Sequence, residues 1–151
     1  MAGQKKHMDY SALNKEIRSG VIRPVYLLSG EEDWLIMQLT QSLIKAVIVP
    51  GSADLDLVQI DVAHQPQNLD TVKVEQEVRS LPFLSPRKMI ILKNTDLFFS
   101  AKGAAKAQID DIRVEIKELL ESFPEDVVLI FQETKSNLSQ KSLLAALEKA
   151  G

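Results

Sequence analysis

The sequence predicts an α/β fold: a doubly wound, three-layer sandwich in which helices cover both faces of a mainly parallel sheet. Two patterns in the 151 residues lead to this prediction. Four short, continuous apolar runs have the length of buried strands, and amphipathic segments with helical spacing alternate with them. Strands joined through helices pair in parallel, and right-handed crossovers then place helices on both sides of the sheet.

The predicted elements alternate along the chain, and their ends carry local signals. Gly20 ends a short first helix, and Pro50-Gly51 ends the second. Ser29 and Glu32 have the spacing of a capping box that opens this second helix. We expect strands over residues 25–28, 57–61, 88–93 and 127–131, and helices over 9–19, from the capping box to about 49, 69–80, 109–120 and 139–151.

Composition narrows the class of protein. The length suits one domain, and 45% hydrophobic with 26% charged residues is ordinary for a globular chain. No apolar run approaches the ~20 residues of a membrane span, so no membrane partner is expected. The absence of cysteine fits a reducing cytoplasm and excludes thiolate metal sites. A net charge of −3 argues against tight, direct binding of DNA.

The first strand-to-helix turn is where a nucleotide would bind in such a fold. A phosphate loop needs glycines that let N–H groups wrap the phosphates, then a lysine and a hydroxyl. Counted from Gly30, Leu35 stands at the second glycine, Ile36 at the lysine and Met37 at the hydroxyl. We therefore expect no ATP binding at this turn and no nucleotide cofactor.

Three carboxylates, those of Glu31, Glu32 and Asp33, follow Gly30. They could hold Mg²⁺, but we expect them to complement the positive end of the helix dipole instead. Asp96 is expected to cap the turn that follows the third strand. His64 lies in a polar loop, where we expect it to be solvated, with no partner that indicates a metal or catalytic pair. No catalytic set and no metal site is predicted.

Trp34 is interpreted as a side chain that packs its helix on the core, not as a base-stacking platform. The low aromatic content, 5%, supports this interpretation.

The segment around residues 81–84 is the most unusual in the chain. Its side chains, Leu81, Pro82, Phe83 and Leu84, precede Pro86 and an Arg87-Lys88 pair. Prolines keep the segment out of a helix or a central strand. Two readings stay open: the apolar side chains fold under the sheet, or they form a rigid wedge that enters a pocket on a partner.

Three motifs carry a resemblance to a known family. They read PVYLLSGEE at residues 24–32, LPFL at 81–84 followed by RKMIILKN at 87–94, and PEDVVLIF at 124–131. Their order and spacing, together with LLAALEKAG at 143–151, resemble the N-terminal domain of the delta subunit of bacterial DNA polymerase III, part of the clamp loader. The likeness begins near residue 21.

The resemblance implies an AAA+-type, P-loop NTPase-like fold that has lost its phosphate loop. It implies that Leu81, Pro82, Phe83 and Leu84 insert into a hydrophobic pocket on the beta sliding clamp. Other clamp-loader subunits would be contacted through the collar domain, which the family's subunit has together with a lid domain and which this chain lacks. DNA would be met only indirectly. Residues 1–20 would then be a lead with a short helix, and 21–151 the first domain of a longer, non-catalytic subunit.

Two other classes of function compete with this interpretation. A receiver-type phosphorelay domain would use Glu32, Asp33 and Lys135, but Asn94 stands where its acceptor aspartate belongs. A nucleotide-dependent enzyme with a non-standard loop is the other alternative.

Overall fold

A four-stranded parallel sheet forms the centre of the molecule. A computed structural model describes residues 9–30, 32–98 and 103–133. The strands are β1 (Val25–Ser29), β2 (Leu57–Asp61), β3 (Lys88–Lys93) and β4 (Val127–Glu133), and they lie in the order β1-β4-β3-β2. All three neighbouring pairs are parallel, with Ile90 of β3 level with Leu129 of β4 and Val58 of β2.

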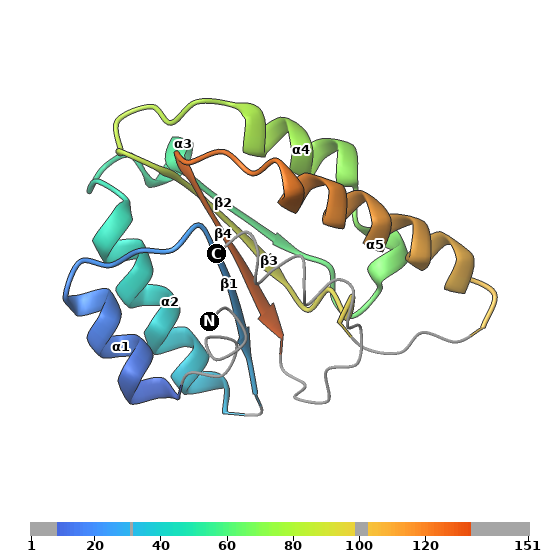
Figure 1. Ribbon diagram of the computed structural model, residues 1–151, viewed down its shortest axis with the longest axis horizontal. Coiled ribbons are helices and arrows are strands. Elements are labelled where there is room, and N and C mark those ends of the chain that lie inside the picture. The colour runs from blue at the N-terminus through green and yellow to red at the C-terminus, as the bar shows by residue number, and fades with distance from the viewer. Residues whose placement is uncertain (1–8, 31, 99–102, 134–151) are drawn as a thin grey trace.

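Helices cover both faces of this sheet, which makes three layers. Figure 1 shows α1 (Tyr10–Arg18) and α2 (Asp33–Val47) along one face, and α4 (Thr71–Arg79) and α5 (Lys106–Glu121) along the other. Two single-turn pieces complete the described chain: α3 (Ala53–Asp56) before β2, and the 3-10 helix η2 (Pro66–Asn68) before α4. The side chains of Asp9 and Asp70 cap α1 and α4 by accepting backbone N–H bonds.

Alternation along the central strands feeds two separate cores. Met89 and Ile91 of β3 pack under α1 and α2, whereas Ile90 and Leu92 pack under α4 and α5. Because successive side chains of a strand point to opposite faces, a strand buried on both sides must be apolar throughout. On the second side the rings of Phe98 and Phe131 meet edge to face, with centroids 5.1 Å apart.

The predicted α/β fold with its parallel sheet is confirmed, but two local predictions are wrong and one short helix was missed. Ser29 is the last residue of β1, Glu32 is the N-cap of α2 and makes no side-chain capping bond, so no capping box forms. Trp34 does not pack on the core, since it is 60% exposed. The four-residue α3 was not predicted. The last helix, predicted over residues 139–151, lies outside the described residues.

None of the helices in the described ranges is long and apolar enough to cross a membrane.

Candidate functional site

The apolar loop, residues 81–84, joins α4 to β3 at the edge of the sheet where the strands begin. Its side chains point away from both cores: Leu81 is 80% exposed, Phe83 66% and Leu84 60%. Pro82 is partly buried. The reading in which these side chains fold under the sheet is therefore wrong. Three large, exposed apolar side chains on one short loop are typical of a binding site.

A buried carboxylate holds the backbone of this loop. Asp56, the last residue of α3, is fully buried. Its Oδ1 accepts a hydrogen bond from the N–H of Phe83, and its Oδ2 accepts from the N–H groups of Leu84, at 3.0 Å, and Ser85, at 2.8 Å. Three successive amides thus converge on one side chain. Burial would raise the pKa of Asp56, but these donors and the Ser85 hydroxyl outweigh it and hold the pKa well below its usual range.

Serine hydroxyls extend this anchor to α2. The Oγ of Ser85 accepts from the N–H of Val49, just after α2, at 2.8 Å. It also lies 2.9 Å from the Oγ of Ser52, which donates to the carbonyl of Val49. The C-terminal end of α2 and the loop are therefore joined by buried polar contacts.

The two basic residues after the loop fasten its base. Arg87 donates from Nη1 to the carbonyl of Ile22 and from Nε to that of Glu125, each at 3.2 Å. Lys88 is buried and donates to a carboxylate oxygen of Glu77 at 2.6 Å and to the hydroxyl of Ser80. Both side chains are engaged with their own chain, so they position the loop.

At the opposite edge, where the strands end, the connection from β1 to α2 is short. Residues 30–32 alone join β1 to α2. Leu35, which stands at the position of the second glycine, already lies in α2. Glu32 and Asp33 are exposed at the start of this helix, where they complement its dipole; Glu31 lies outside the described residues.

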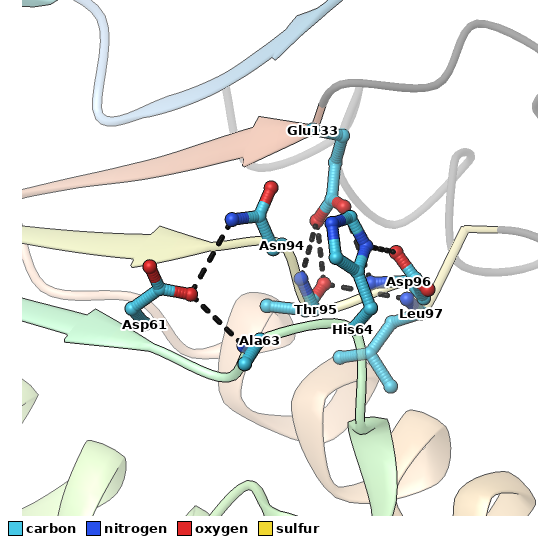
Figure 2. A network of polar contacts seen from close by, with 8 residues as sticks. All are labelled: Asp61, Ala63, His64, Asn94, Thr95, Asp96, Leu97 and Glu133. Carbon is cyan, nitrogen blue, oxygen red and sulfur yellow. Dashed lines mark hydrogen bonds and ion pairs between the residues drawn. The ribbon is translucent and has the colours of Figure 1, made fainter.

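A polar network ties the ends of β2, β3 and β4 together at this edge (Figure 2). Asp61 accepts from the N–H of Ala63 and from the side-chain amide of Asn94. His64 is exposed, as expected, and its Nδ1 lies 2.9 Å from Asp96 Oδ1, a contact that was not predicted. Four residues that are not glycine have positive φ angles here: Ala63, His64, Asn94 and Asp96.

Glu133 closes this network from β4. Its carboxylate is fully buried and accepts from the N–H of Thr95 at 3.3 Å, from the Thr95 hydroxyl, and from the N–H of Asp96 at 3.1 Å. Burial raises the pKa of Glu133, and these donors only partly offset the effect. The backbone N–H of Asp96 is thus held by Glu133, while its side chain contacts His64.

The network does not form a metal site within the described ranges. No group of three or more carboxylate or imidazole side chains there is arranged to hold an ion. A cavity of about 230 Å³ lies beside the network, between α2 and the strand ends. Its lining mixes apolar, amide and charged side chains, namely Asp33, Ile36, Met37, Thr40, Gln41, Ile44, Gln59, Lys93, Asn94, Gln132 and Glu133.

Sequence reasoning found the apolar loop but missed the residues that hold it. Asp56 stands in a polar stretch, ADLD, where an exposed carboxylate is the ordinary expectation. Its partners in the loop lie 27 to 29 residues further along the chain. No pattern of spacing or composition links the two segments, so no signal in a single sequence indicates this contact.

The strand order contradicts the receiver-type alternative. In a flavodoxin-like receiver fold, the order 2-1-3-4-5 puts the first strand between the second and third. Here β1 pairs with β4, and β2 pairs with β3. Lys135, the lysine assigned to that alternative, lies outside the described residues.

Most of the chain matches the profile of a known protein family. Residues 26–151 match the profile of a family described as DNA polymerase III, delta subunit. DNA polymerase III subunit delta of Bacillus subtilis strain 168 is 25% identical over 136 residues, which are 89% of this chain and 38% of that protein.

Two solved structures share the fold. The Bacillus subtilis DNA clamp loader delta protein superposes with a TM-score of 0.79 at 19% identity, over 95% of this chain and 41% of that one. A DNA polymerase III gamma subunit-related protein of Thermotoga maritima gives a TM-score of 0.63 at 17% identity, over 93% of this chain and 44% of that one. The chain thus spans less than half the length of these relatives.

Proposed function

Because the chain belongs to the DNA polymerase III delta subunit family, we propose that it binds the beta sliding clamp through the apolar loop and helps to open the ring for loading onto primed DNA. The observation that carries this proposal is the exposure of Phe83 and Leu84 on a loop whose backbone is tied down. Exposed apolar anchors on a fixed backbone are suited to a pocket on a partner.

The loop offers enough apolar surface for a specific contact. Burying a large aliphatic or aromatic side chain stabilises a complex by about 1.5–3 kcal/mol. Leu81, Phe83 and Leu84 together would therefore contribute several kcal/mol, of which a part is offset by the entropy lost on association. Pro82 limits that loss by restricting the backbone between them.

Opening follows from differential binding. A closed ring and an opened ring are two states of the clamp, and a ligand shifts their populations only by its preference for one of them. Moving a 1:99 equilibrium to 99:1 takes roughly 5.5 kcal/mol of preference. A loop that inserts more deeply beside an opened interface would provide a share of that preference.

The proposed role is non-catalytic. In this chain Leu35, Ile36 and Met37 stand at the glycine, lysine and hydroxyl positions of a phosphate-binding loop. Other subunits of the loader would therefore supply ATP hydrolysis. Residues 21–151 would be the first domain of a longer subunit, whose further domains contact the other subunits. DNA would be met within the assembled loader.

The binding proposal is tested by replacing the two anchors together. We expect Phe83→Ala/Leu84→Ala to weaken binding of the purified cognate beta clamp by at least 100-fold, measured by surface plasmon resonance, without changing the circular dichroism spectrum. The control is Val114→Ala, which removes a similarly exposed apolar side chain on α5 and should leave affinity unchanged. Unaltered affinity in the double variant would refute the assignment.

Opening is tested on clamp rings already closed around nicked circular DNA. We expect the unaltered chain to accelerate release of the ring, followed by gel filtration, and the double variant to leave the release rate at its spontaneous value. An equal rate with and without the chain would restrict the role to binding.

A further inference from the structure

We propose that Asp56 is the positioning residue of the clamp-binding surface: by accepting three successive backbone N–H bonds it holds residues 83–85 in the conformation that directs Phe83 and Leu84 outward. The inference rests on the proposed function, because it assumes that residues 81–84 meet the clamp. It goes further because it assigns the geometry of the loop to one side chain that cannot itself touch the clamp, since Asp56 is fully buried.

The geometry leaves Asp56 as the main support for this stretch of backbone. The side chains of Leu81, Phe83 and Leu84 are exposed, so packing against the cores does not fix them. The amides of Phe83, Leu84 and Ser85 instead point inward to the two oxygens of one carboxylate. With their amides held in this way, the side chains of Phe83 and Leu84 lie in solvent, whereas that of Ser85 is buried.

Charge makes this anchor specific for an aspartate. Each carboxylate oxygen accepts from the loop, and an ionised carboxylate is the only side chain of this size with two acceptor oxygens and no donor. Asparagine would present an N–H₂ group to at least one loop N–H, placing donor against donor. Hydrogen bonds to a charged acceptor are also stronger than those between neutral groups.

The position of Asp56 in the fold makes the anchor rigid. It ends α3 and immediately precedes β2, whose five residues are paired with the central strand β3. The loop leads directly into β3 itself. The loop is therefore fixed to two neighbouring strands of the sheet, and its order is present before any partner binds. A surface that is ordered in advance loses less entropy on association.

The first measurement needs no substitution. Amide hydrogen exchange, followed by NMR on the unaltered chain, should show slow exchange at Phe83, Leu84 and Ser85, although two of these side chains are exposed. Leu81, whose amide makes no contact with Asp56, is the internal reference and should exchange quickly. Exchange of all four amides at the rate of an unfolded peptide would overturn the inference, whether or not any variant folds.

The second measurement separates positioning from general stability. We expect Asp56→Asn to speed exchange at residues 83–85 by at least tenfold while the amides of β3 and β4 keep their rates. Clamp affinity should fall about 10- to 100-fold, the effect of losing hydrogen bonds to a charged group. The matched control is Asp54→Asn, which removes an exposed carboxylate from the same helix and should change neither quantity.

The outcomes distinguish this inference from the proposed function. If Phe83→Ala/Leu84→Ala loses binding and Asp56→Asn frees the loop amides but binds at full affinity, the positioning role is refuted and the clamp-binding role stands. If the double variant also binds at full affinity, the clamp-binding role itself is refuted. Loss of affinity in Asp56→Asn, with exchange changed only in the loop, supports both.

Discussion

The buried ammonium group of Lys88 lies 2.6 Å from a carboxylate oxygen of Glu77, and this ion pair joins the first residue of β3 to α4. The apolar loop is the segment between these two elements. The pair therefore closes the base of the loop, and Ser80 adds a second acceptor for the same ammonium group. This contact therefore contributes both to the stability of the fold and to the position of the proposed binding surface.

Replacing Lys88 with methionine should destabilise the fold. The substitution leaves Glu77 without its partner, although a side chain that is 30% exposed regains part of its hydration. We expect a loss of about 1–3 kcal/mol, below the cost of a fully buried broken pair. Urea denaturation followed by circular dichroism measures this loss.

The control for that substitution is Lys106→Met. Its partner Asp110 lies at 2.8 Å, but both side chains are about half exposed. An exposed pair contributes at most about 1 kcal/mol. Equal losses in the two variants would contradict the structural importance of the Lys88 contact.

Truncation of two phenylalanines should have very different effects on the free energy of unfolding. Phe98 is fully buried against Phe131, so Phe98→Ala should cost about 3–5 kcal/mol in the free energy of unfolding. Phe83 is 66% exposed, and Phe83→Ala should change that energy by less than about 0.5 kcal/mol. Denaturant midpoints measure both. A large loss of stability in Phe83→Ala would show that this ring supports the fold.

The contribution of Glu133 to the free energy of unfolding should fall as the pH rises. Burial raises its pKa in the folded state above the ordinary value of 4.5, so the folded protein binds its proton more tightly than the unfolded chain does. The resulting stabilisation is complete below pH 4.5 and is lost as the pH rises through the folded pKa. Glu133→Gln removes this dependence.

The measurement compares the unaltered chain with Glu133→Gln in urea at several pH values. Other carboxylates, such as Asp56, have lowered pKa values and act in the opposite direction, but they are the same in both proteins and cancel in the difference. We expect the difference between the two unfolding free energies to shift in favour of the variant from pH 4.5 upwards and to level off above the folded pKa of Glu133. A constant difference across this range would contradict the assignment.

Ala63 should be more stable as glycine. Its φ angle is +57°, in the left-handed region where a Cβ costs roughly 1–2 kcal/mol. Ala63→Gly removes this strain, and the greater freedom of glycine in the unfolded chain offsets about half of the gain. We expect a stabilisation of about 0.5–1 kcal/mol, visible as a higher Tm in calorimetry. A lower Tm would show that the methyl group has a packing role.

Structural features that depend on a local pattern could be predicted from the sequence. The continuous apolar runs of β3 and β4 predict buried parallel strands because every position in them must face a core. The prolines around Phe83 predict an irregular loop because they exclude regular hydrogen bonding. The residues that stand in place of a phosphate-binding motif, Leu35, Ile36 and Met37, are also read from consecutive positions.

Features that depend on contacts between distant segments could not be predicted. The burial of Asp56 depends on a loop that arrives 27 residues later, and the pairing of His64 with Asp96 joins two turns that are 32 residues apart. Trp34 was assigned to the core from its residue type and the low aromatic content, neither of which shows on which side of the helix it lies. With 3.6 residues per turn, three consecutive side chains of a helix cannot all face the same core, and Ile36 takes the buried position.

A parallel sheet gives the molecule a direction, with every strand starting at one end and finishing at the other. The six residues of β3, at ~3.3 Å each, separate those ends by roughly 20 Å. Phe83 projects from the starting end, while Glu32 and His64 stand at the finishing end. A fluorescent reporter attached at Glu32, which is exposed, would follow the motion of this domain without obstructing the proposed contact with the clamp.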